Sequence, residues 1–91
     1  MKDDVDLERI ARVIKALKEA ACKKEMYLTA DDRVSEADAA ALLDLSPGSL
    51  KSLRLQLCGP AHYYRGAGNG SRISYRIDDL AAWLERYRQA S

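Results

Sequence analysis

Apolar residues recur at helical spacing through the first part of the chain. Steps of three and four residues place one set on a single face, with Val13 beside them: Leu7, Ile10, Ile14, Leu17 and Ala21. The pattern predicts an amphipathic helix over residues 4–25. The apolar stripe packs either on its own domain or on a second subunit. The polar face carries four basic residues, Arg9, Arg12, Lys15 and Lys18, and either faces solvent or contacts an anionic partner such as a nucleic acid.

A short helix is predicted to begin after Ser35. Ser35 is a favourable N-cap, and Asp38 three residues later forms an acidic variant of the capping box. The helix is expected to end near Asp44. A face of small residues would let another helix approach closely, and it comprises Ala37, Ala40, Ala41 and Leu43.

A second short helix is predicted directly afterwards. Ser46 caps it, and Pro47 takes the first helical position, where its missing N–H costs nothing. Leu50, Leu53 and Leu57 share the buried face, Arg54 lies at its edge, and the sequence Gly59–Pro60 ends the helix. The opposite face presents Gly48, Lys51, Ser52 and Leu55. Residues 53–57 also alternate with period two, so a strand is the alternative there.

Two strand-like runs follow, over residues 62–65 and 72–77, joined by the Gly-rich segment 66–71. In the second run Ile73, Tyr75 and Ile77 share one face, while the basic residues lie on the other. This predicts a hairpin with one apolar and one basic side. Asp78 is then expected to cap a last helix, with Trp83 as the largest part of the core. The apolar face of that helix is Leu80, Trp83, Leu84 and Tyr87.

These elements predict a mainly α fold with a small β-hairpin, a winged helix-turn-helix preceded by an N-terminal amphipathic helix. Residues 26–33 interrupt the pattern, with a short extended segment expected over 26–29. Residues 1–30 are therefore assigned to the leading helix and linker, and residues 31–91 to a DNA-binding domain.

The distribution of charge points to a polyanionic partner. The chain carries 15 Lys and Arg against 14 Asp and Glu, a net charge of +1. Residues 45–77, however, contain no acid, and their basic residues are Lys51, Arg54, Arg65, Arg72 and Arg76. A local excess of this kind attracts nucleic acid while the rest of the surface stays acidic.

Composition argues against several other classes. A single histidine, no Ser-His-acid set and no phosphate loop predict that the protein is not an enzyme and has no cofactor. Cys22 and Cys58 are expected to be free buried thiols, and Cys58 with His62 cannot complete a zinc site. The acidic N-terminus is not a signal peptide, and no apolar run is long enough to span a membrane, so the predicted location is cytoplasmic.

Helix-turn-helix geometry assigns roles to single residues. The second helix enters the major groove, which places Lys51 and Ser52 at base edges and Ser49 at a phosphate. Arg54 contacts a phosphate or, alternatively, pairs with the Glu36/Asp38 helix. Arg76 contacts the backbone or minor groove, or pairs with Asp79. His62 is expected to be structural. The hairpin adds Arg65, Asn69 and Arg72 to the DNA-binding set.

The segment from Ser35 to Pro47, SEADAAALLDLSP, resembles the opening of the MerR-like winged helix-turn-helix domains of phage excisionases and AlpA-type regulators. Gly59–Pro60 and the sequences around Tyr75–Arg76 and Ala82–Leu84 fit the same pattern. Many members carry a basic residue where this chain has Gly48.

The resemblance implies a protein that binds specific double-stranded DNA as a dimer or cooperative array. Such a protein assists an integrase in excising a mobile element or regulates a promoter. Small terminase subunits of phages are similar in this domain, so a DNA-recognition subunit of a larger assembly is one alternative. A protein-interaction domain that reuses the fold is the other.

Overall fold

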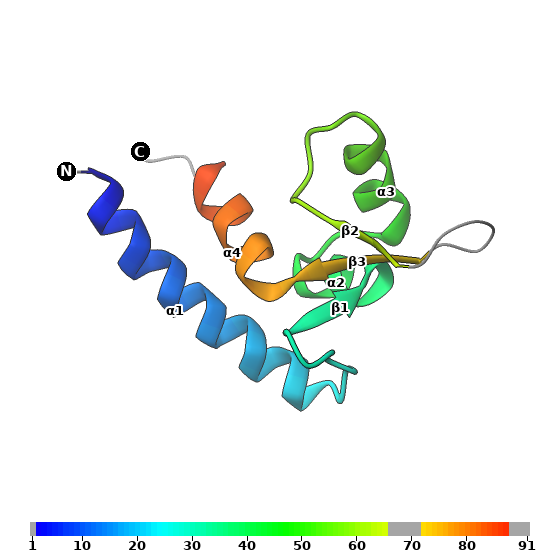
Figure 1. Ribbon diagram of the computed structural model, residues 1–91, viewed down its shortest axis with the longest axis horizontal. Coiled ribbons are helices and arrows are strands. Elements are labelled where there is room, and N and C mark those ends of the chain that lie inside the picture. Colours follow the sequence, from blue (N-terminus) through cyan, green and yellow to red (C-terminus); the bar gives the residue numbers. More distant parts are fainter. Residues whose placement is uncertain (1, 66–71, 88–91) are drawn as a thin grey trace.

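The computed structural model describes the backbone of residues 2–65 and 72–87 and the side chains of residues 7–64 and 73–87. Within these ranges the chain is mainly helical with a small antiparallel sheet, as predicted (Figure 1). The elements in order are α1 (Lys2–Lys23), β1 (Arg33–Ser35), α2 (Glu36–Leu42), α3 (Pro47–Leu55), β2 (Tyr63–Arg65), β3 (Arg72–Arg76) and α4 (Ile77–Arg86). The predicted Gly-rich tip, 66–71, lies outside the described residues.

The sheet contains a strand that the sequence analysis missed. Its order is β1-β3-β2, with β3 in the centre and both pairings antiparallel. Val34 of β1 lies opposite Tyr75, and Tyr64 of β2 lies opposite Ile73. The extended segment expected over 26–29 is not a strand; the pairing begins at Arg33 instead. β1 has only three residues, too few for a period-two pattern to be recognised.

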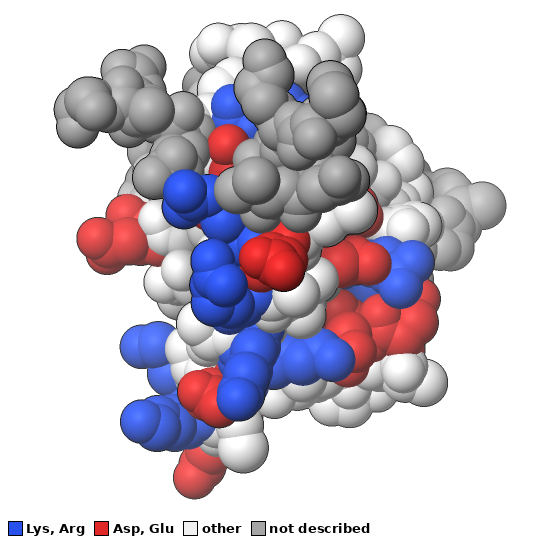
Figure 2. Space-filling model, turned by 90° about the vertical axis from the view of Figure 1, so that its left-hand side faces the viewer, with Lys and Arg blue, Asp and Glu red and all other residues white. Residues whose placement is uncertain are grey.

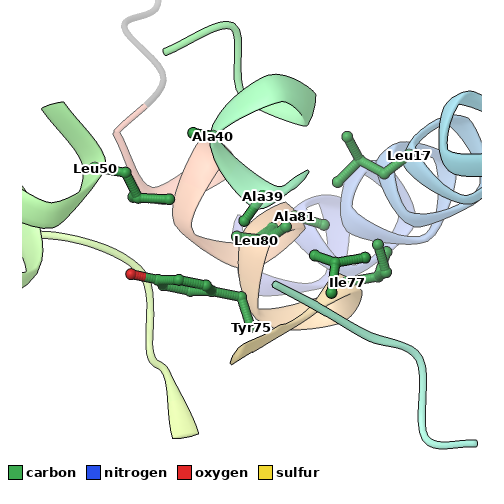
Figure 3. Close-up of a cluster of buried hydrophobic side chains, with 9 residues drawn as sticks. Leu17, Ala39, Ala40, Leu50, Tyr75, Ile77, Leu80 and Ala81 are labelled. Carbon is green, nitrogen blue, oxygen red and sulfur yellow. The ribbon is translucent and has the colours of Figure 1, made fainter. Parts of the chain in front are cut away.

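One apolar core joins all the helices (Figure 3). The stripe of α1 packs within its own chain, because Leu17 belongs to the same buried cluster as the α4 residues Leu80 and Ala81. Ile10, Val13 and Ile14 pack against that cluster, whereas Leu7 is 65% exposed. The side chains that are fully buried and largest are Tyr75, Leu50, Ile77, Leu80 and Val34.

Trp83 does not form the largest part of the core, contrary to the prediction. It is half-buried, and its indole N–H donates a hydrogen bond to the carbonyl of Cys58 at 2.9 Å. The indole therefore ties the segment after α3 to α4. Cys22 and Cys58 are both free, as expected, but both are exposed and not buried.

Three helices end in the same backbone motif, earlier than predicted in each case. Beyond α1, α2 and α3 the chain turns at Glu25, Asp44 and Leu57, whose φ values of 58°, 61° and 60° are left-handed. The amide of the next residue then donates to the carbonyl five residues back, as in Cys58 N to Leu53 O at 2.9 Å. This Schellman arrangement satisfies the last carbonyls of each helix. Leu57 consequently points out of the fold and is 88% exposed.

The start of α4 also differs from the prediction. Asp78 is not the cap: Arg76 holds the N-cap position, without a side-chain cap, and Ile77 is the first helical residue. The amide of Ile77 donates to the carbonyl of Asp32 at 2.9 Å, so the turn before β1 supplies an acceptor for one of the first amides of α4, which have no partner within the helix. Among the described helices, none combines the length and apolarity needed to cross a membrane.

Candidate nucleic-acid interface

The α2–α3 pair is fixed by the two caps that the sequence predicts. The hydroxyl of Ser35 accepts from the amide of Asp38 at 3.1 Å, and that of Ser46 accepts from the amide of Ser49 at 3.1 Å. Each cap satisfies an amide that has no partner within its helix. Only residues 43–46 separate the two helices, so α3 must turn back sharply from α2.

The face of α3 predicted to meet a ligand is open to solvent. Gly48, Lys51 and Ser52 are exposed, and Leu55 is 65% exposed. Leu50, one residue before Lys51, has no exposed surface, so the helix separates a buried side from an outward side as its period requires. Ser49 is exposed and accepts a hydrogen bond from the Ser46 hydroxyl at 2.9 Å, which leaves its own hydroxyl proton available.

Arg54 takes the second of the two roles considered for it, the pair with the α2 helix. Its Nε donates to Glu36 Oε2 at 2.8 Å and its Nη2 donates to Oε1 at 3.1 Å, a two-bond contact. The hydroxyl of Tyr75 donates to the same Oε2 at 2.7 Å. The Arg54 and Glu36 side chains are 11% and 20% exposed. Arg54 is thus held within the fold and does not reach out from α3.

Two pKa shifts follow from this contact. The hydrogen bonds from Arg54 hold the pKa of Glu36 below its ordinary value of 4.5, against the opposing effect of burial. Burial, and then the hydrogen bond to Glu36, raise the pKa of Tyr75 above its usual 10. At neutral pH the network therefore consists of a carboxylate, a guanidinium and a neutral phenol.

The sequence offers the Glu36/Asp38 helix as a partner for Arg54, but it places the inward face of α2 one residue too late and so does not single out Glu36. Ala39 and Ala40 are fully buried, whereas Ala37 and Ala41 are exposed. The inward positions therefore follow steps of three and four from Glu36 itself. A glutamate at the head of such a row is a detectable signal, since a carboxylate on an inward face requires a partner there.

On the outer side of the sheet, Arg33 and Arg76 interact with other residues of the protein. Arg76 Nε lies 3.4 Å from Asp78 Oδ1, so the carboxylate that pairs with Arg76 is Asp78 and not Asp79, the alternative to a DNA contact that the sequence suggests. Arg33, which no local sequence pattern marks as functional, lies opposite Arg76 across the β1–β3 pair. Its guanidinium is 5.2 Å from the Tyr63 ring centre and donates to Ser74 Oγ at 3.2 Å. Arg33 therefore spans the sheet from its edge strand.

The remaining predicted residues belong to the hairpin. Arg65 of β2 and Arg72 of β3 are opposite each other in register. Their side chains, and the whole of Asn69, lie outside the described part of the structure. His62 packs edge-on against Tyr64, with ring centres 5.4 Å apart, and lies 6.0 Å from Tyr75. These contacts agree with a structural role for His62.

The side of the molecule on which α1 and α4 lie carries charges of both signs. Figure 2 shows lysine and arginine groups running down this side with acidic groups next to them. One such pair joins α1 to the turn before β1, with Lys18 Nζ 3.0 Å from Asp32 Oδ2. Neighbouring opposite charges reduce the field that a polyanion would meet there. The described part of the acid-free segment lies away from this side, in α3 and in the strands β2 and β3 (Figure 1).

Comparison with protein-family models, with curated proteins and with solved structures finds no match for this chain. Membership in the MerR-like family therefore stays a hypothesis from the sequence resemblance.

Proposed function

We propose that the protein binds double-stranded DNA as a winged helix-turn-helix protein. In this proposal α3 is the recognition helix in the major groove, and the β2–β3 hairpin is the wing against the backbone or the minor groove. One observation carries the proposal: α3 exposes Lys51 and Ser52 at the middle of its outward face while its other face is fixed to the fold. A recognition helix needs both properties, because its outward side chains must reach base edges while the helix itself is held in place.

Charge supports the same assignment. Lys51 forms no ion pair with any described carboxylate, whereas Lys18 on α1 does. The N-terminus of α3 also carries the positive end of the helix dipole, which favours phosphate nearby. Ser49, exposed beside it, is suited to donate to a phosphate oxygen. Arg65, Asn69 and Arg72 are proposed contacts of the wing.

The biological role we propose follows the sequence resemblance. The protein acts without catalysis or cofactor, either with an integrase in excision of a mobile element or as a promoter regulator. It binds as a dimer or as a cooperative array along DNA. A DNA-recognition subunit of a packaging complex uses the same surface, and the mass of the assembly by light scattering separates the two roles.

The first test is fluorescence anisotropy with mixed-sequence duplex DNA from about 50 to 300 mM salt. Several phosphate contacts produce a steep fall in affinity with salt, with a slope of about −0.9 per contact on a log–log plot. Lys51→Ala is expected to weaken binding to a site enriched from random sequence by the wild-type protein by about 1–3 kcal/mol. It should also relax the preference for particular bases. Lys15→Ala, an equal charge change on α1, is the matched control and should leave both properties unchanged. Equal effects of the two variants would contradict the assignment of α3.

A second candidate is a protein-interaction domain, which one observation favours. Leu55 and Leu57 at the end of α3 are 65% and 88% exposed, and neighbouring exposed leucines often mark a protein contact. Absence of DNA binding at the lowest salt, with α3 still folded, would support this candidate over the first.

A further inference from the structure

Three separate elements meet at the carboxylate of Glu36. It lies in the first turn of α2, Arg54 reaches it from the last turn of α3, and Tyr75 reaches it from the central strand β3. Both carboxylate oxygens are used, and Oε2 accepts from Arg54 Nε at 2.8 Å and from the Tyr75 hydroxyl at 2.7 Å. Figure 3 shows the Tyr75 ring in the core, with its hydroxyl at the end directed toward α3. The sheet and both helices are therefore joined at one point.

This network of charged hydrogen bonds differs from an apolar contact in being directional. Hydrogen bonds to a charged group are directional, and the two-bond arginine–carboxylate contact fixes the relative plane of both groups. Ion pairs of low exposure frequently add less stability than an apolar replacement of equal volume. Their attested advantage is a unique geometry. The network is consequently better suited to fixing how α3 is rotated than to raising stability.

The rotation of α3 matters because Lys51 and Ser52 are on the same short helix as Arg54. A helix with its side chains is about 10–12 Å wide, so a turn of about 10° moves a surface atom by about 1 Å. Base-edge contacts need positioning to within about 0.5 Å. A loss of rotational control that leaves the fold intact is therefore enough to remove sequence discrimination.

We infer that Glu36, Arg54 and Tyr75 form an orientation lock that sets the sequence specificity of DNA binding by α3. The inference rests on the proposed DNA-binding function. The three residues are positioning residues, since none of them needs to touch DNA. In this inference Arg54 has a role distinct from the phosphate contact that the sequence suggests.

The test compares two duplexes: a site enriched from random sequence by the wild-type protein, and a mixed-sequence duplex. Tyr75→Phe keeps the buried ring and removes only the hydroxyl, and Arg54→Gln removes the guanidinium. For each we expect the ratio of the two affinities to fall about three- to tenfold, the size of one or two lost hydrogen bonds. The salt slope should not change. The controls are Tyr27→Phe, at a tyrosine that is 75% exposed, and Arg12→Gln on α1.

The outcomes separate the possible roles of Arg54. If Arg54→Gln weakens both duplexes equally and lowers the salt slope by about one contact, while Tyr75→Phe has no effect, Arg54 is a phosphate contact and the lock is wrong. Wild-type binding without any sequence preference would equally overturn the role in specificity. Such a result leaves DNA binding itself in place.

Failure of the proposed function gives a different result. If the wild-type protein binds no DNA, the role in specificity falls with it, and amide hydrogen exchange then tests the structural part alone. The lock predicts faster exchange in α3 for Tyr75→Phe and Arg54→Gln, with α4 unchanged. Unchanged exchange in α3 would show that the three residues do not restrain it.

Discussion

The α1–α4 region and the α2–α3 region of this protein share one apolar core, but the α2–α3 region also contains a directional ion pair. Where α1 meets α4, the contact is made of apolar side chains, Leu17 against a cluster that includes Leu80 and Ala81. Where α2 meets α3, the buried side chains are Ala39 and Ala40 of α2 and Leu50 of α3, and an ion pair from Glu36 to Arg54 adds to this apolar contact. Apolar burial is strong and non-directional, while the ion pair is weaker and directional.

The difference suggests a division of work within a small fold. A chain of 91 residues buries a limited core, so most of its stability must come from the apolar contacts that it can make. The region that presents the proposed ligand-binding helix, α3, depends more on a precise helix orientation than on a large contribution to stability. Substitutions in the first region should therefore change stability, and substitutions in the second should change geometry at a smaller cost.

The largest expected effect is in the apolar region. Leu80→Ala removes a side chain with no exposed surface from the centre of the cluster, which should lower the free energy of unfolding by about 2–5 kcal/mol. Urea denaturation followed by circular dichroism measures it. Leu7→Ala, at a leucine that is 65% exposed on α1, is the control and should cost less than about 0.5 kcal/mol. A loss for Leu7→Ala as large as that for Leu80→Ala would contradict the exposed position of Leu7.

A smaller effect is expected in the polar region, and it should depend on pH. Glu36→Gln weakens the contact with Arg54 and should cost about 1–2 kcal/mol at neutral pH. Since the folded-state pKa of Glu36 is depressed, its contribution is present above the ordinary value of 4.5. That contribution is lost as the pH falls through the lower, folded-state value. The stability difference between wild type and variant should therefore shrink in acid.

Urea denaturation at a series of pH values from 7 to about 3 tests this. Asp31→Asn is the comparison, because hydrogen bonds from Thr29 and then Arg33 lower the pKa of Asp31 to about 2, away from α3. Only Glu36→Gln should also disturb α3, as seen by amide exchange. A difference between wild type and Glu36→Gln that stays constant down to the lowest pH would show that the ionised carboxylate is not what the network uses.

The two regions also differ in how far the sequence predicts them. The α1 stripe, both caps and the hairpin follow from local patterns, since periodicity and capping involve residues a few positions apart. The contact between Glu36 and Tyr75 could not be predicted, because the two residues are 39 positions apart and no local pattern connects them. The alanines of α2 did not reveal the error, because an Ala is tolerated on either face.

Two further features of the structure are also not visible in local sequence patterns. β1 is three residues long, and its pairing is decided by the free edge of β3 and not by its own composition. The predicted end of α3 used Gly59–Pro60 as the stop, but the chain turns earlier at a leucine with positive φ. Nothing in the sequence indicates a leucine there, since this conformation favours glycine. The outward face of α3, in contrast, is as predicted, because Ser46 and Pro47 set its register.

The smallest expected effect tests this strained turn at the end of α3. Leu57→Gly relieves a left-handed conformation that costs a residue with a Cβ about 1–2 kcal/mol, and it adds about 0.5–1 kcal/mol of entropy to the unfolded chain. Because Leu57 is 88% exposed, little packing is lost, and the net gain should be about 0.5 kcal/mol. Asp44→Gly at the end of α2 is the control and should gain less, because Asp tolerates this conformation better.

If Leu57→Gly stabilises the isolated chain but abolishes binding of a protein partner, the strain is retained for that contact. If it destabilises the chain, Leu57 packs against α3 more than its exposure indicates.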